Sequence, residues 1–138
     1  MYLEKSNVFS KNQFGFRQNK DTSIALQTLV SCIHNNLDEG NLTLGIFLDV
    51  KKAFDSVDHK ILLNKLDKYG IRGIANNLIK SFLENRSQQV CINDVLSNLN
   101  VLNYGVPQGT VLGPLLFIVY INDLLSLDLE CSIICFAD

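Results

Sequence analysis

Two apolar segments of this chain each end on an aspartate, and this pattern limits the folds that the chain can adopt. The first is Phe47-Leu48-Asp49 and the second is Cys135-Phe136-Ala137-Asp138. Both faces of residues 42–50 are mostly apolar, which predicts a strand that is covered on both sides. An unpaired ionised aspartate on such a strand is costly, and a metal ion held between two of them would remove the cost. The alternative for the first of them, that Asp49 only caps the next turn, stays open.

The remaining patterns indicate an α+β fold. With 138 residues the chain is at most one domain. Capping residues and apolar spacing predict the helices, and short apolar runs between turn residues predict the strands. The expected helices are residues 22–38, 58–69, 73–85 and 110–125, and the expected strands are 42–50, 88–92, 99–104 and 132–136. The first helix should bury one face and the last should be buried nearly all round. Strands 88–92 and 99–104 should form a hairpin through Asn93-Asp94, with a connection longer than a tight turn. Helices packed on a small, mostly antiparallel sheet are expected.

A glycine-rich loop, Gly105-Val106-Pro107-Gln108-Gly109, lies between the two aspartates and opens the last helix. Glycine lets a backbone come close to a ligand, and a helix N-terminus attracts phosphate. The Gln108 amide offers a donor and an acceptor to a nucleotide or a template strand. An ordinary strand-to-helix turn explains the same residues equally well.

An aromatic residue follows the first aspartate closely. Phe54 lies just past the expected strand, where its ring could form the floor under a sugar and reject a 2′-hydroxyl by contact. A core phenylalanine that closes the turn is an equal alternative, and both roles are compatible. Asp58 is expected to cap the next helix, and His59 is expected at the surface without a catalytic role.

The net charge of −2 argues against a free-standing nucleic-acid binder, because such proteins usually carry an excess of basic residues. Lys51, Lys52 and Arg17 could contact phosphate, although solvated surface charge is the commoner explanation for the two lysines. The longest apolar stretch, residues 111–121, is too short to span a bilayer, which needs about 20 residues. No membrane association is therefore expected, and no targeting signal indicates a cellular location.

Together these segments resemble the reverse transcriptases of non-LTR (LINE or jockey-type) retrotransposons. The match extends over nearly the whole chain from about Asn12, with four motifs in the family's order. They are the segment Asn12-Gln13-Phe14-Gly15-Phe16-Arg17 with Thr22-Ser23, motif A at residues 47–59, motif B at residues 104–117, and the start of motif C at Phe136-Ala137-Asp138.

The resemblance implies a role for each matching residue. Asp49 and Asp138 would be the catalytic acids and would bind two Mg²⁺ ions, or Mn²⁺, together with the main-chain carbonyl of Val50. Phe54 would exclude ribonucleotides. Gln108 and Gly109 would contact the incoming dNTP and the template, while Arg17 would belong to the base of the fingers. The implied partners are an RNA template, a DNA primer and dNTPs.

The chain departs from the family pattern in what it lacks. A second aspartate should follow Asp138, and upstream finger strands, the rest of the palm and the thumb are expected elsewhere in a parent polyprotein. We therefore expect residues 1–138 to be a single partial domain, with the fingers base and the palm, that is truncated within motif C. Such an interior fragment should be inactive alone. The alternatives are a non-catalytic remnant of a decayed retroelement and a group II intron-type maturase. Phe54 argues against an RNA-dependent RNA polymerase, which must admit the 2′-hydroxyl.

Overall fold

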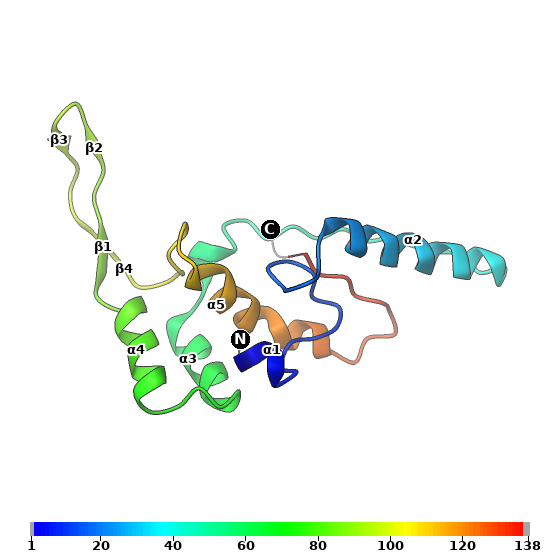
Figure 1. Cartoon of the computed structure of the whole chain (residues 1–138). Coiled ribbons are helices and arrows are strands. Elements are labelled where there is room, and N and C mark those ends of the chain that lie inside the picture. Colours follow the sequence, from blue (N-terminus) through cyan, green and yellow to red (C-terminus); the bar gives the residue numbers. More distant parts are fainter. Residues whose placement is uncertain (1, 137–138) are drawn as a thin grey trace. The chain divides into compact units, whose positions relative to one another are not determined.

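The computed structural model describes residues 2–136 (Figure 1). These residues divide into two compact units. One unit contains residues 2–51 and 121–136, and the other is Lys52–Tyr120. Among residues 2–136, helices come before and after a run of four short antiparallel strands, so the expected α+β class is confirmed. The expectation of a single partial domain stays a prediction.

The unit Lys52–Tyr120 begins with the 3-10 turn η1, Phe54–Ser56, and continues into helices α3, His59–Lys68, and α4, Ile74–Leu83. Asp58 caps α3 as expected, because its Oδ1 accepts a hydrogen bond from the Ile61 amide at 3.0 Å. Helix α4 packs against α3, and the Asn76 side chain donates to the Leu63 carbonyl at 3.1 Å. The apolar residues of the two helices that exclude solvent almost completely are Leu62, Leu66 and Leu83.

Helix α5, Leu112–Ile121, is apolar all round and largely buried, as the sequence predicts. The helix was expected to reach residue 125, but a 3-10 turn, η2, Asn122–Ser126, replaces its end. The side chain of Asn122 explains this difference. It accepts from the Ser10 amide and donates to the Val8 carbonyl, both at 2.9 Å, and such side-chain bonds compete with a regular helix. None of the helices within residues 2–136 has the length and apolar character that crossing a bilayer requires.

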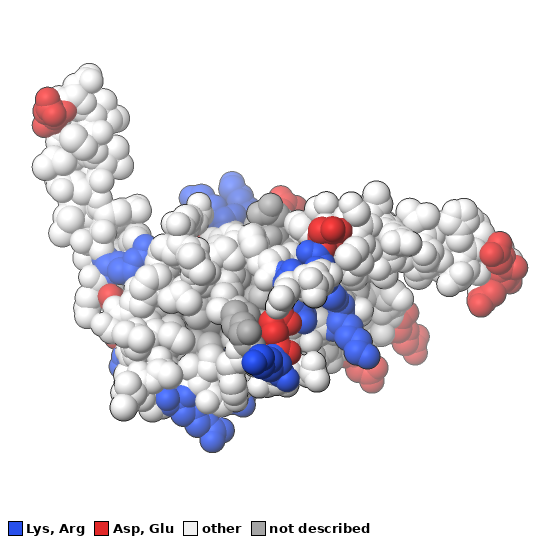
Figure 2. Space-filling model, in the orientation of Figure 1, with Lys and Arg blue, Asp and Glu red and all other residues white. Residues whose placement is uncertain are grey.

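The expected hairpin is present, but its connection is tighter than predicted. Strand β1, Arg86–Gln88, pairs antiparallel with β4, Asn100–Leu102, and β2, Cys91–Ile92, pairs with β3, Val95–Leu96. Asn93 and Asp94 alone form the turn, both with positive φ (48° and 62°), which suits a two-residue hairpin loop. Figure 1 shows β2 and β3 at the far end of this ribbon. Its surface in Figure 2 is nearly uncharged, because Asp94 is the one charged residue between residues 87 and 103.

The other unit contains the short helix α1, Tyr2–Lys5, and the long helix α2, Thr22–Asp38. The bounds of α2 agree with the prediction, and the Asp21 side chain caps it through the Ile24 amide at 2.8 Å. The prediction of one buried face is wrong. Ala25 is the buried residue of α2, while Leu26 and Leu37 are each about 60% exposed. The apolar side of a helix is buried only where another part of the chain packs against it. Among residues 2–136 such packing is found near the start of α2, at Ala25.

The two strands predicted to end on the aspartates are not formed. Residues 41–50 run back past α2 as extended chain (Figure 1), and they pair with no strand among residues 2–136. Their apolar side chains are 63–100% exposed; these are Leu42, Leu44, Ile46, Phe47, Leu48 and Val50. Residues 132–136 make a single parallel bridge, between Cys135 and Gln13, rather than a strand. Both predictions are wrong for one reason: an apolar run becomes a strand only when another backbone pairs with it.

Candidate functional site

The turn of motif A and the loop of motif B are joined by main-chain hydrogen bonds within the unit Lys52–Tyr120. The Gly105 amide donates to the Val57 carbonyl at 2.8 Å, and the Val106 amide donates to the Phe54 carbonyl at 2.9 Å. An isolated antiparallel bridge between Asp58 and Tyr104 extends this pairing. Segments about 50 residues apart in sequence therefore form one junction, which is called the A–B junction below and consists of residues 54–59 and 104–110.

Gly105 is required at the A–B junction by space and by backbone conformation. Its φ is +88°, a region that residues with a Cβ rarely adopt. A Cβ atom built on Gly105 would lie 2.9 Å from the Cα of Asp55, which is closer than real Cβ atoms approach. The sequence suggested that glycine in this loop allows close approach of a ligand. At Gly105 the group that approaches is the backbone of motif A.

His59 is also part of the A–B junction, although the sequence analysis placed it at the surface. Its side chain is buried, with the residue 7% exposed, and its Nε2 lies 2.8 Å from the Gly105 carbonyl oxygen. The prediction was wrong because the partner lies 46 residues away and leaves no local signal. The helical spacing did contain a hint: His59, Leu62 and Leu66 occur at i, i+3 and i+7, and all three are buried on α3.

Phe54 is half-buried and stacks on Phe117 of α5, with ring centroids 4.5 Å apart. This contact supports the packing role that the sequence left open beside the gating role. The two roles remain compatible because a half-buried ring still presents surface to solvent. Whether Phe54 also selects the sugar stays a prediction.

Gln108 and Gly109 lie at the exposed tip of the motif B loop. The Gln108 amide nitrogen lies 3.3 Å from Oδ1 of Asp55, so it also contacts the motif A turn. Gly109 has φ of +74°, and a Cβ built there would meet no atom within 4 Å. The loop is fixed at the start of α5 by Thr110, whose hydroxyl donates to the Pro107 carbonyl at 2.8 Å and accepts from the Gly113 amide at 3.1 Å. The A–B junction thus presents Gln108 and Gly109 on a braced loop.

Comparison with known proteins shows the family of this chain. The family model for reverse transcriptase (RNA-dependent DNA polymerase) matches residues 1–138. The chain belongs to this family. It is 34% identical over 128 residues to the probable RNA-directed DNA polymerase from transposon BS of Drosophila melanogaster, which covers 88% of the chain and 13% of that protein. It is 36% identical over 119 residues to the RNA-directed DNA polymerase from mobile element jockey of the same species, with 86% and 13% covered.

The resemblance to reverse transcriptases of jockey-type elements is therefore confirmed. A third relative, the probable RNA-directed DNA polymerase from transposon X-element of Drosophila melanogaster, is 35% identical over 122 residues. The chain spans about 13% of the length of these curated relatives.

Two of the predicted metal ligands of this reverse transcriptase segment, Asp49 and Val50, belong to the other unit. Asp49 and Val50 are exposed, and the Asp49 carboxylate has no hydrogen-bond or ion-pair partner among residues 2–136. Asp138 lies outside the described residues. Across residues 2–136 no three acidic, histidine or cysteine side chains gather into a metal site. The donor types nevertheless fit magnesium, since carboxylate and carbonyl oxygens are the hard ligands that this ion prefers.

Arg17 occupies a structural position in the same unit as Asp49. Its guanidinium donates to both carboxylate oxygens of Glu4, at 2.7 and 2.8 Å, and to the Ser10 carbonyl at 3.0 Å. The guanidinium also lies over the ring of Phe9, 4.9 Å from its centroid. The hydrogen bond from Arg17 lowers the pKa of Glu4, against the opposing effect of burial. Arg17 therefore fixes α1 to the chain that follows it, and a contact with substrate stays a prediction.

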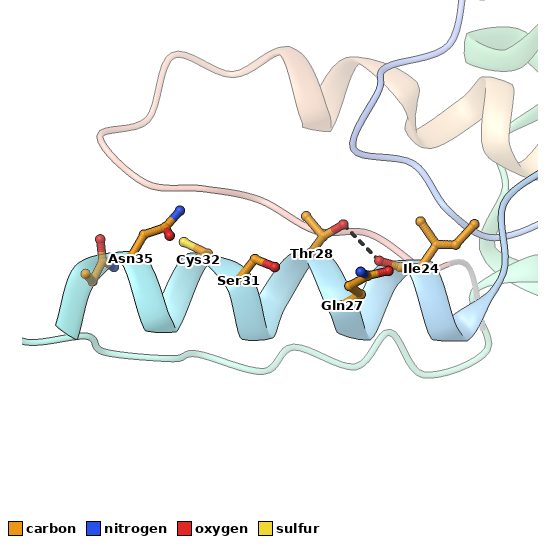
Figure 3. A pocket seen from close by; sticks show the side chains of 7 residues that line it. Ile24, Gln27, Thr28, Ser31, Cys32 and Asn35 are labelled. Atoms are coloured by element: carbon orange, nitrogen blue, oxygen red, sulfur yellow. Dashed lines mark hydrogen bonds between the residues drawn. The ribbon is translucent and has the colours of Figure 1, made fainter. Parts of the chain in front are cut away.

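The hollows of the surface do not coincide with the predicted site residues. A hollow of about 520 Å³ lies along α2, and the side chains that line it point to the same side of this helix (Figure 3). It is lined by Ile24, Gln27, Thr28, Ser31, Cys32, Asn35 and Asn36. A second hollow, of about 370 Å³, adjoins the A–B junction, where Asp58, His59 and Tyr104 contribute to its wall.

Proposed function

We propose that this chain is part of an RNA-directed DNA polymerase that adds dNTPs to a primer 3′-end on an RNA template. Family membership over residues 1–138 supports the class of reaction. The observation that carries the proposal is the A–B junction, which fixes Phe54 and Gln108 on two hydrogen-bonded segments. A site that selects nucleotides needs side chains held in constant positions, and hydrogen-bonded main chain provides this rigidity.

Each predicted residue has a role in this proposal. Phe54 excludes the ribose 2′-hydroxyl by contact, and Gln108 and Gly109 contact the incoming dNTP and the template. Arg17 stabilises the base of the fingers through Glu4 and Ser10. The chain carries a net charge of −2, so the basic groups that grip the template and primer are expected mainly in the other fingers, palm and thumb segments.

The metal ligands in this proposal are Asp49, the main-chain carbonyl of Val50 and Asp138. They would hold two Mg²⁺ ions, or Mn²⁺, which when bound stabilise charge on the attacking and leaving oxygens. The described residues supply the Asp49 carboxylate without a competing cation, so it is available to an ion. The chain spans about 13% of the length of its curated relatives, so we expect the isolated chain to be inactive without the other segments of the polymerase.

A chimeric polymerase tests this function. Residues 1–138 replace the matching segment of the jockey polymerase of Drosophila melanogaster, and incorporation of dNTPs is measured on a primed RNA template. We expect the chimera to extend the primer and the isolated chain not to do so. An inactive chimera beside an active unmodified jockey polymerase would refute the proposal and favour the non-catalytic remnant of a retroelement.

A further inference from the structure

The ring of His59 holds one particular peptide group of the motif B loop. Its Nε2 lies 2.8 Å from the carbonyl oxygen of Gly105. A carbonyl oxygen only accepts hydrogen bonds, so Nε2 must carry the proton and donate. The contact is therefore made by the neutral tautomer that is protonated at Nε2, or by the imidazolium, and not by the tautomer protonated at Nδ1.

The same peptide group is held on its other side by motif A. The Gly105 carbonyl and the Val106 amide belong to one planar peptide group. Its N–H donates to the Phe54 carbonyl at 2.9 Å, while its C=O accepts from His59. The peptide is thus held at both polar ends, once by the backbone of Phe54 and once by a side chain on α3. Gln108 follows two residues after Val106, on the segment that this peptide orients.

We propose that His59 is a positioning residue that sets the placement of the motif B loop relative to Phe54 and thereby affects nucleotide selection. This inference rests on the proposed function. His59 acts through the 105–106 peptide rather than by touching the substrate, because its side chain is buried and already bonded to that peptide. Without the bond from His59, the 105–106 peptide keeps the main-chain bond from the Val106 amide to the Phe54 carbonyl but loses the bond to its own carbonyl oxygen. The segment that carries Gln108 is then less firmly fixed relative to Phe54.

Two variants separate the hydrogen bond from the volume of the ring. In His59→Gln the side-chain amide nitrogen stands near the position of Nε2 and can still donate, whereas in His59→Leu the volume is filled without a donor. The matched control is His34→Leu, because His34 is the other histidine of the chain and is exposed on α2. In the chimera we expect His59→Leu to raise the KM for dNTPs by about 10- to 100-fold and to lower discrimination against rNTPs. His59→Gln should restore most of both, and His34→Leu should change neither.

Nitrogen NMR on the 138-residue chain tests the hydrogen bond without any activity. In a buffer of about pH 8.5, where an ordinary histidine is neutral, we expect His59 to be protonated at Nε2, and His34 to show the averaged signal of an exposed ring. Protonation of His59 at Nδ1 would overturn the proposal. So would an active chimera in which His59→Leu lowers thermal stability but leaves the KM and rNTP discrimination unchanged. An inactive unsubstituted chimera would refute the proposed function, and with it the nucleotide-selecting role of His59. The NMR measurement of the His59 tautomer would still show whether the hydrogen bond to Gly105 exists.

Discussion

The rings of Phe54 and Phe117 stack with centroids 4.5 Å apart and an interplanar angle of 23°. Phe117 is a buried residue of α5, so it covers one face of the Phe54 ring with a fixed surface. Phe54 itself is half-buried on the motif A turn. The buried helix α5, which follows the motif B loop, therefore sets the orientation of the aromatic residue in motif A. A ring that excludes a 2′-hydroxyl by contact, and not by a hydrogen bond, needs such a fixed orientation.

Replacing Phe54 by valine should admit ribonucleotides. The smaller side chain removes the surface against which the ribose hydroxyl would collide, so rNTP incorporation by the chimera should rise by about 10- to 100-fold relative to dNTP incorporation. Steady-state kinetics with matched dNTP and rNTP pairs measure this ratio.

The control for this substitution is Phe82→Val, the same change of volume on α4, outside the A–B junction. It should leave sugar discrimination as it is. Unchanged discrimination in Phe54→Val would reduce Phe54 to a packing residue, in which case only stability should fall, by about 1–3 kcal/mol.

Gly105→Ala should destabilise the chain more than Gly109→Ala. Both glycines have positive φ, which costs an alanine about 1–2 kcal/mol. Only at Gly105 does the added Cβ also collide with backbone, since it would lie 2.9 Å from the Cα of Asp55. Crowding of this kind adds about 1–3 kcal/mol. Urea denaturation of the two variants gives the comparison, and equal losses would show that the A–B junction is not packed as described.

The helices could be predicted from the sequence because their signals are local. Asp21 and Asp58 cap α2 and α3, and both cap bonds are present at the expected positions. In the same way, the Asn93-Asp94 pair indicated the turn of the hairpin, which begins with β1 and ends with β4. In each case the deciding contacts join residues only a few positions apart, so a pattern within one short window is sufficient.

The misses at residues 42–50 and at His59 involve partners that are far away in sequence. Residues 42–50 have the composition of a covered strand, yet a strand forms only when a second backbone pairs with it, and composition cannot supply that partner. His59 was misplaced for the same reason, because its acceptor, the Gly105 carbonyl, lies 46 residues away. In the candidate site, the motifs indicated which residues to expect, and those roles stay predictions; they did not indicate that motifs A and B would bond to each other.

Asp49→Asn should remove activity without changing stability. Asp49 is exposed and has no hydrogen-bond or ion-pair partner within the described part of the chain, so its loss should change the unfolding free energy by no more than about 0.5 kcal/mol. An amide is a poor ligand for magnesium compared with a carboxylate, so dNTP incorporation by the chimera should fall at least about 100-fold. Asp94→Asn at the hairpin turn is the matched control and should keep full activity. Normal incorporation by Asp49→Asn would remove this residue from the metal site.

The Glu4–Arg17 pair should make the stability of the chain sensitive to acid. The hydrogen bond from Arg17 lowers the pKa of Glu4 in the folded chain, so the stabilisation is complete above the ordinary glutamate pKa of about 4.3 and is lost as the pH falls through the lowered value. At pH 7 we expect Glu4→Gln to cost about 2 kcal/mol, because bonds to a charged partner are lost. The difference between the native chain and Glu4→Gln should shrink steadily below about pH 4. Urea denaturation across pH 3–7 measures it, with the exposed Glu130→Gln as a control that should show little effect at any pH. A cost that does not depend on pH would mean that packing of the side chain, and not its charge, holds α1 in place.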